Sequence, residues 1–159
     1  MSERCGMVLD VPSYCEGIAF LETTELKSDA TNFFKKFERP TLNRLESQIQ
    51  ETETLLDDWD SYGAPPPNQE ALRWARESVP LADSERFLPH NIAASAEGGI
   101  ALCWDDKDVH AYIEFSNDGS AVSVMYRGME DPYVREFSPE QTTITGMLGE
   151  VRVFFSNES

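Results

Sequence analysis

The groups in this sequence that could do covalent chemistry are few, and the best pair is a thiol and an imidazole. Cys103 and His110 lie on either side of an expected hairpin, where a cysteine beside a histidine can act as a nucleophile. The alternative is a small core cysteine beside an ordinary surface histidine. Because His90 is the only other histidine, triads and histidine-rich metal sites have few possible members.

Standard catalytic motifs are missing from the chain. It contains no phosphate-binding loop of the form GxxxxGK[ST], no GxGxxG, no GxSxG and no HExxH. The three cysteines, Cys5, Cys15 and Cys103, are an odd number without paired metal-ligand spacing, so we expect free thiols. The sequence therefore predicts a protein that is not an enzyme and that uses no cofactor and no metal.

Carboxylates cluster where the first expected helix ends. Asp57, Asp58 and Asp60 stand at the negative end of its dipole, which disfavours them unless a divalent cation or a cationic partner neutralises them. The alternative is a solvated helix end at which Asp60 caps the following turn. The acidic segment 105–108 lacks the spacing of a calcium loop and is expected to be a charged hairpin tip.

The charge balance is strongly acidic. Acidic residues number 29 and basic residues 13, which gives a net charge of −16. Residues 41–88 and 89–131 contribute −6 each, and the two ends of the chain −2 each. Such a charge repels phosphates, so we expect no direct nucleic-acid binding and a basic protein partner instead. The alternative is that the acidity only secures solubility.

Two helices are expected before the sheet. Apolar residues at spacings of three and four predict a helix that begins at Pro40, and segment 63–67, with its three prolines, must end it. Its apolar stripe is Leu42, Leu45, Ile49, Thr52, Leu56 and Trp59. A second helix is predicted from an Asn68 cap to Pro80. Trp74 falls off its apolar face, so we expect an exposed indole that anchors a protein partner.

From Pro89 onward the hydrophobic period changes to two, which predicts a sheet. The expected strands are 92–94, 100–104, 109–115, 122–126 and, as a short edge strand, 133–137. Ser138 to Gln141 is expected to be a capping box that opens a C-terminal helix. The apolar face of that helix is Ile144, Met147, Leu148, Val151, Phe154 and Phe155.

The elements together predict an α+β fold with two N-terminal helices, an antiparallel meander of three to five strands, and a C-terminal amphipathic helix packed on the sheet. Residues 40–159 are expected to be one domain, and residues 1–39 a partly ordered arm in which Phe33, Phe34 and Phe37 contact a partner. Without an apolar run long enough for a membrane span, or an apolar leader, the expected location is the cytoplasm.

Three segments carry a resemblance to other proteins. They are segment 56–66, which contains the run WDSYGA, segment 98–104, which begins Gly-Gly and ends in tryptophan, and segment 113–119, which ends in an Asn-Asp-Gly turn. This pattern resembles a group of small bacterial proteins that share a WDxxGA segment, a glycine turn, a strand ending in tryptophan and a DG hairpin. The resemblance covers roughly residues 45–127. It implies a bacterial or phage origin and a common fold, and it carries over no catalytic residue.

These observations predict a binding protein of the antitoxin, immunity or inhibitor type, whose acidic surface docks on a basic partner such as a nucleic-acid enzyme or a toxin. The predicted partner-binding residues are Asp57, Asp58, Asp60, Trp74, Phe33, Phe34 and Phe37. Three alternatives stay open. One is an interaction subunit of a larger bacterial or phage assembly held by apolar contacts. The others are an unfamiliar enzyme and a small-ligand sensor that uses the sheet face of Tyr112 and Glu114.

Overall fold

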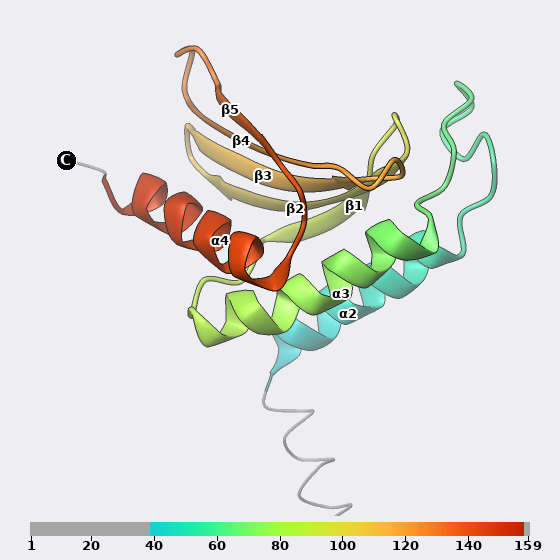
Figure 1. The fold of residues 1–159 in the computed structure, drawn as a ribbon, viewed down its shortest axis with the longest axis horizontal. Helices are drawn as coiled ribbons and strands as arrows, with labels where there is room; N and C mark the ends of the chain where they lie inside the picture. The colour runs from blue at the N-terminus through green and yellow to red at the C-terminus, as the bar shows by residue number, and fades with distance from the viewer. Residues whose placement is uncertain (1–38, 158–159) are drawn as a thin grey trace, which may run out of the picture. The chain divides into compact units, whose positions relative to one another are not determined.

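The computed structural model describes residues 39–157, in which three helices accompany a five-stranded antiparallel sheet (Figure 1). The elements are α2 (Pro40–Glu53), α3 (Gln69–Ser84), β1 (Asn91–Ala94), β2 (Gly99–Asp106), β3 (Val109–Ser116), β4 (Ala121–Arg127), β5 (Tyr133–Phe137) and α4 (Gln141–Ser156). The predicted antiparallel meander and the C-terminal helix on the sheet are both confirmed. None of the described helices is long and apolar enough to cross a membrane.

The sheet is a meander because each strand pairs with the next one in the chain, in the order β1-β2-β3-β4-β5. Short turns make this possible. Gly119 adopts a φ of +87° in the turn between β3 and β4, and the Asp118 carboxylate accepts hydrogen bonds from the backbone and side chain of Ser120. These turns fix the register, and the register decides which side chains face the helices.

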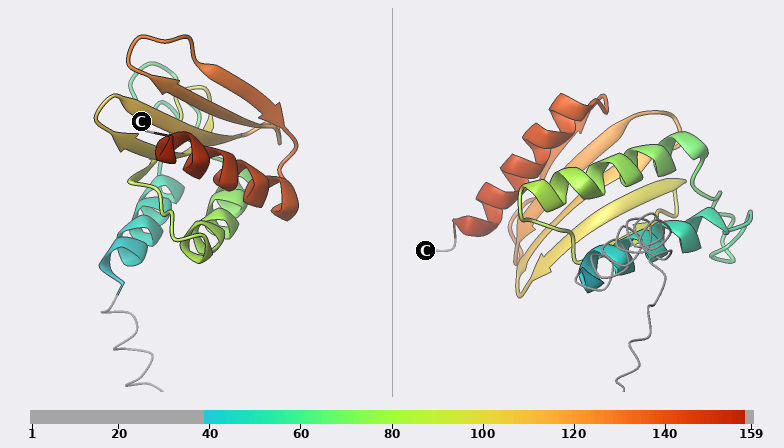
Figure 2. Two further views of the ribbon diagram at one scale, coloured as in Figure 1. Left: turned by 90° about the vertical axis from the view of Figure 1, so that its left-hand side faces the viewer. Right: turned by 90° about the horizontal axis from the view of Figure 1, so that it is seen from below.

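All the described helices lie on one side of the sheet (Figures 1 and 2). Helix α2 contacts β1, α3 contacts β2 and β3, and α4 contacts β4 and α3. Alternate strand residues meet these helices and form the core. Its largest fully buried side chains are Trp104, Phe115, Leu45, Leu72, Ile100, Leu102, Ile113, Ile144 and Leu148.

Trp104 is the centre of this core. Its indole N–H donates to the carbonyl of Phe87 at 3.2 Å, and its ring stacks on the Phe87 ring with centroids 5.6 Å apart. Phe155 of α4 meets Phe87 edge to face. The tryptophan that ends the β2 pattern therefore ties the sheet to α4 through one aromatic cluster.

Helix α2 is shorter than predicted. It ends at Glu53, so Leu56 is not part of a buried stripe, and its side chain is 78% exposed. The hydroxyls of Thr52 and Thr54 each donate to the carbonyl three residues earlier, at 2.8 Å. Such local bonds compete with helix propagation, and the chain leaves the helix here.

Helix α3 is longer than predicted. Asn68 is its N-cap, as expected, and its side chain accepts from the Ala71 N–H at 2.9 Å. The helix nevertheless continues through Pro80 to Ser84. Ala82 is fully buried in the core, and this packing offsets the backbone hydrogen bond that the proline cannot donate.

The cap of α4 lies two residues beyond the predicted one. The N-cap is Glu140, not Ser138, and Gln141 is already the first residue of the helix. The Thr143 hydroxyl accepts from the Glu140 N–H at 2.9 Å, so threonine takes the role expected of Gln141. The predicted apolar face is confirmed: Ile144, Met147, Leu148 and Val151 are buried, and the two phenylalanines are half-buried.

Candidate functional site

One face of the sheet points away from the helices, and we call it the outer face. Residues that alternate with the core positions form it, and the register places them in rows across the strands. The first row is Asn91, Cys103, Tyr112, Val124 and Val134. The second row is Ala93, Ala101, Glu114, Val122 and Glu136, and a third, shorter row is Asp105, His110 and Tyr126.

The outer face carries charge of one sign. Glu114 and Glu136 flank Val122 in one row. The two arginines of the described strands both turn to the helix side: Arg135 pairs with Glu150 of α4 at 2.5 Å, and Arg127 donates to a backbone carbonyl of α4. The strands therefore place carboxylates, and neither lysine nor arginine, on this face.

Aromatic rings lie among these carboxylates. The His110 ring stacks on Tyr126 with centroids 4.9 Å apart, and its Nδ1 is 2.8 Å from a carboxylate oxygen of Asp105. Tyr112 lies in the neighbouring row. Burial, and after it the charge of Glu114, raises the pKa of the Tyr112 hydroxyl. The face is thus both aromatic and electrically negative.

Cys103 occupies this face too, opposite Tyr112 rather than His110. Burial raises its pKa to about 11, with further contributions from Asp105 and Glu114. A thiol with this pKa is protonated at neutral pH, which is the reverse of what activates a cysteine nucleophile. The geometry gives no support to the alternative of an enzyme built on Cys103 and His110.

The predicted trio of carboxylates does not stand at a helix end, because α2 has ended before it. Asp57, Asp58 and Asp60 belong to loop 54–68, which joins α2 to α3. An Asp60 oxygen accepts from the N–H groups of Tyr62 and Ala64, and these bonds lower the Asp60 pKa. Asp60 therefore caps a turn, which was the alternative to a cation site. Asp57 is exposed and stays a predicted partner contact.

Asp58 is also used inside this loop. Its carboxylate accepts from the Gly63 N–H at 2.7 Å. Asp58 and Ser61 both have a φ near +60°, at 63° and 64°, which is strained for residues other than glycine. The resulting compact loop leaves Leu56 78% exposed and Tyr62 94% exposed. A strained, self-bonded loop that holds large apolar side chains in solvent is typical of a contact surface.

Asn117 locks this loop to the sheet, and sequence reasoning missed it. Its side-chain oxygen accepts from the Asn68 N–H at 2.7 Å, and its amide donates to the Pro66 carbonyl at 2.9 Å. Its own N–H donates to the Gly98 carbonyl. The three segments that the resemblance singled out thus meet at one end of the sheet. The Asn-Asp-Gly turn was recognisable, but its partners, about fifty residues away, were not.

The other predicted contacts fare differently. Trp74 is half-buried against the core rather than exposed, with the Arg73 guanidinium 4.1 Å from the centre of its ring. Its indole N–H is buried and has no hydrogen-bond partner in the described chain. The prediction that the Trp74 indole is exposed is therefore wrong. Phe33, Phe34 and Phe37 lie outside the described residues.

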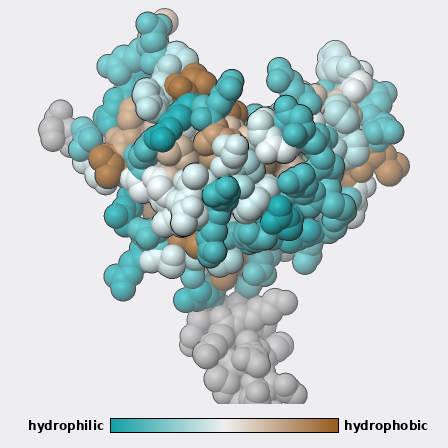
Figure 3. All heavy atoms as spheres, viewed as in Figure 1, coloured by the Kyte–Doolittle hydropathy of each residue, from teal (hydrophilic) through white to brown (hydrophobic). Residues whose placement is uncertain are grey.

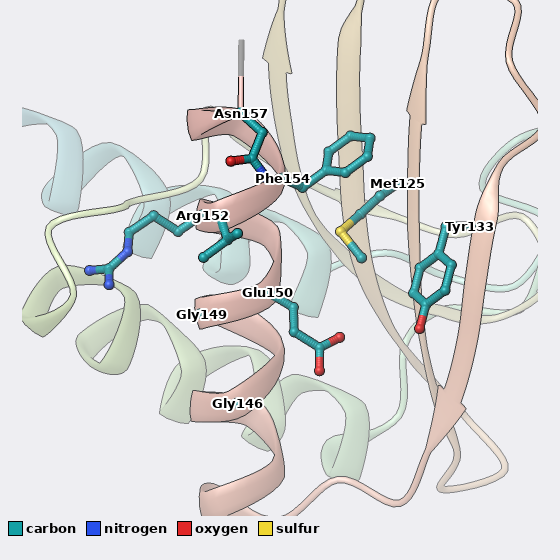
Figure 4. Close-up of a pocket in the computed structure, with 9 residues that line it drawn as sticks. Met125, Tyr133, Gly146, Gly149, Glu150, Arg152, Phe154 and Asn157 are labelled. Atoms are coloured by element: carbon teal, nitrogen blue, oxygen red, sulfur yellow. The ribbon is translucent and has the colours of Figure 1, made fainter. Parts of the chain in front are cut away.

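An open groove of about 560 Å³ lies between α4 and the end of the sheet at β5 (Figure 4). Its wall residues come from β4, β5, α4 and the C-cap of α4: Met125, Tyr133, Gly146, Gly149, Glu150, Arg152, Val153, Phe154 and Asn157. Gly146 and Gly149 have no side chains, so helix backbone is bare on one side of the groove. A Cβ at either position would meet nothing within 4 Å, so the space beside them is open. Tyr133 and Val153 are each more than half exposed.

Seen from the direction of Figure 1, hydrophilic residues cover most of the surface, with a few apolar residues between them (Figure 3). Across residues 39–157, no three His, Cys, Asp or Glu side chains come together as the ligands of a metal ion would.

No family model, curated protein or solved structure matches the chain.

Proposed function

We propose that this protein is a non-enzymatic binding protein that docks on a basic protein partner through the outer face of its sheet. The carrying observation is the separation of charge between the two sides of the strands. Glu114, Glu136 and Asp105 face outward, whereas Arg127 and Arg135 face α4. A surface of one sign steers an oppositely charged partner and rejects a like-charged one.

The aromatic residues of this face support the same proposal. A guanidinium or ammonium group gains from lying over a tyrosine ring, and Tyr112 and Tyr126 provide such rings beside carboxylates. Burial is the main cause of the raised pKa values of Tyr112 and Cys103, and the charge of nearby carboxylates raises them further. The same charge favours a bound cation.

The class of partner follows from this chemistry. Proteins that act on nucleic acids present basic surfaces, because they must neutralise phosphates. An acidic face with aromatic anchors is suited to cover such a basic surface and block it. Antitoxins, immunity proteins and inhibitors of nucleic-acid enzymes act in this way. The predicted partner is accordingly a basic toxin or a nucleic-acid enzyme.

Charge reversal on the outer face tests this proposal. The tagged protein is used to isolate partners at moderate salt from the cells that make it, beside the double variant Glu114→Lys and Glu136→Lys. The matched control is Glu46→Lys with Glu51→Lys, which changes the charge equally on α2, where both residues are exposed. We expect a basic protein with the wild type and the control, lost from the outer-face variant and released by salt.

Two results would contradict the proposal. One is recovery of the protein alone, and the other is a partner that the outer-face variant retains as well as the wild type does. Circular dichroism of each variant separates lost binding from lost folding.

A second candidate is an interaction subunit held by apolar contacts, and loop 54–68 favours it. Leu56 and Tyr62 stand exposed on a loop that its own hydrogen bonds hold in shape. Tyrosine anchors of this kind carry much of the binding energy at protein interfaces. A partner that persists at high salt and is lost from Tyr62→Ala would favour this function over electrostatic docking.

A further inference from the structure

The two edge strands of the sheet, β1 and β5, differ in whether their outer backbone groups have hydrogen-bond partners. At the β1 edge, the Ile92 N–H donates to the Gln48 side chain of α2 at 3.1 Å, so α2 satisfies part of that edge. Strand β5 pairs with β4 on one side, and no described residue hydrogen-bonds to the backbone of its other side. Unpaired strand edges are ready to bind a further strand.

The groove along α4 lies directly beside this edge. Tyr133 opens the strand and also lines the groove, as Val153 of α4 does, and both side chains are more than half exposed. Figure 4 shows Tyr133 and Met125 on the sheet side and Glu150 and Phe154 on the helix side of this space. A strand added to β5 would project alternate side chains toward the groove and toward the outer face.

We infer that β5 and the α4 groove together bind an extended segment of the basic partner as a sixth strand. This inference rests on the proposed function and names how that partner is held. Backbone hydrogen bonds to β5 supply one part of the affinity. Apolar side chains of the segment enter the groove between Tyr133 and Val153, and the side chains between them reach the outer face beside Glu136.

Charge complementarity defines this segment. On the groove side, Arg135 is already neutralised by Glu150. On the outer side, Glu136 follows Val134 by two residues along the strand and has no ion-pair partner among the described residues. A segment that alternates apolar residues with lysine or arginine satisfies both sides at once.

A second copy of this chain fits the edge less well. Symmetric antiparallel pairing of β5 with itself centred on Arg135 places two arginines opposite each other, and pairing centred on Glu136 places two glutamates opposite. Like charges directly opposite destabilise a strand pair. Of the three inner positions, only Val134 gives a centre without this conflict, so the edge suits a different chain better.

Synthetic peptides provide the probe. The test peptide has seven residues that alternate lysine and valine, with both ends blocked and a fluorophore attached through a flexible linker. One control peptide has the same composition with the lysines grouped together. The other carries N-methyl groups on alternate amides, which removes the donors that would pair with β5. Fluorescence anisotropy with the full chain at low salt measures the affinity of each peptide.

The variants separate the groove from the rest of the surface. Gly149→Leu fills the groove, and because a Cβ there meets nothing, it should not disturb the fold. Gln50→Leu is the matched control, since it places the same side chain at an exposed position of α2, a helix that does not line the groove. Thermal unfolding of both variants confirms that the chain is folded.

We expect the alternating peptide to bind at least about tenfold more tightly than either control peptide, because both the edge and the groove contribute. Gly149→Leu should lower its affinity by a similar factor, and Gln50→Leu should leave it unchanged. Equal binding of all three peptides, or an unchanged affinity for Gly149→Leu, overturns strand addition.

Failure of this inference is distinguishable from failure of the proposed function. If the grouped-lysine peptide binds the wild type as well as the alternating one and is lost from Glu114→Lys with Glu136→Lys, basic docking stands and strand addition falls. If no lysine peptide binds, both fall. A concentration-dependent dimer in sedimentation, abolished by Gly149→Leu, would assign the edge to a second copy instead.

Discussion

The two faces of the sheet are built from the same strands and have opposite characters. On the helix side, Leu102, Ile113 and Phe115 are at most 1% exposed, and they pack with α2, α3 and α4. On the outer side, the residues between them include Tyr112 and Glu114, which are partly exposed and acidic or aromatic. The first face holds the fold together, and the second is the face on which we propose that a partner docks.

This difference between the two faces shows which residues can indicate a binding partner. Apolar core residues are interchangeable with others of similar volume, so they report mainly on packing. A glutamate flanked by alanine and valine on an open face contributes little to packing. Such a residue is the better guide to a partner, and substitutions on the two faces should separate stability from binding.

The largest expected difference in stability is between two aromatic residues of β3 that face opposite sides of the sheet. Phe115→Ala removes a side chain with no exposure and should lower the free energy of unfolding by about 3–5 kcal/mol. Tyr112→Ala on the outer face should cost about 1 kcal/mol or less, because only cross-strand contacts are lost. Urea denaturation of both variants measures this difference. Equal losses would mean that the outer face is as tightly packed as the core.

Two tryptophans give the next contrast. Trp104→Phe removes the hydrogen bond to Phe87 and leaves a gap, so we expect a loss of about 2 kcal/mol. Trp74→Phe removes an indole N–H that is buried without a partner, and this relief offsets the smaller ring. The Trp74 variant should lie within about 1 kcal/mol of the wild type in the same assay. A loss as large as that of Trp104→Phe would show that the Trp74 indole is in fact satisfied.

Substitution of two glycines by alanine, one in α4 and one in the turn between β1 and β2, should change stability in opposite directions. Gly149→Ala should raise stability by about 0.5–1 kcal/mol, because the position is helical and unobstructed. Gly98→Ala should lower stability by about 1–2 kcal/mol, since Gly98 has a φ of +89° and its new Cβ would lie 2.7 Å from Pro65. Differential scanning calorimetry distinguishes the two. A destabilised Gly149→Ala would mean that the groove is closed in solution.

The last contrast is a dependence of stability on pH that belongs to the outer face. The folded state raises the pKa of Cys103 from 9.0 to about 11, so folding favours the neutral thiol. The resulting stability is complete below pH 9 and is lost as the pH rises toward 11. Urea denaturation at pH 8 and pH 10.5 should show this decline, and Glu114→Gln should reduce it. A slope unaffected by Glu114→Gln and by Cys103→Ala would assign the decline to other groups.

Much of the sheet was predictable, because its signal is local. The alternation from Ile100 to Phe115 identifies two strands, and the Asn-Asp-Gly turn fixes where the next one begins. The ends of the helices were not predictable from periodicity. Leu56 matches the stripe of α2 but lies beyond the point at which Thr52 and Thr54 turn the chain. Pro80, conversely, interrupts the pattern of α3 but not the helix.

The candidate surface was only partly predictable, since it depends on register between strands. The sequence shows that Glu114 and Glu136 exist, but only the paired strands show that both flank Val122 and that the arginines turn away. The aspartates of loop 54–68 were visible as a cluster. The bonds of Asp58 and Asp60 to nearby N–H groups occur in a loop whose backbone is left-handed at Asp58 and Ser61, and the periodicity of the sequence does not indicate that conformation.

The bonds of Asn117 also have a consequence for the order in which the molecule forms. Asn117 is joined to Asn68 and Pro66 across 49 and 51 residues, whereas the hairpins of the meander close over a few residues each. Chain closure over long separations is slow, so the hairpins should be in place before loop 54–68 reaches them. In stopped-flow experiments, Asn117→Ala should then accelerate unfolding and leave the refolding rate almost unchanged. The hydrogen bonds between Asn117 and loop 54–68, the loop that exposes Tyr62, should therefore form last during folding and break first during unfolding.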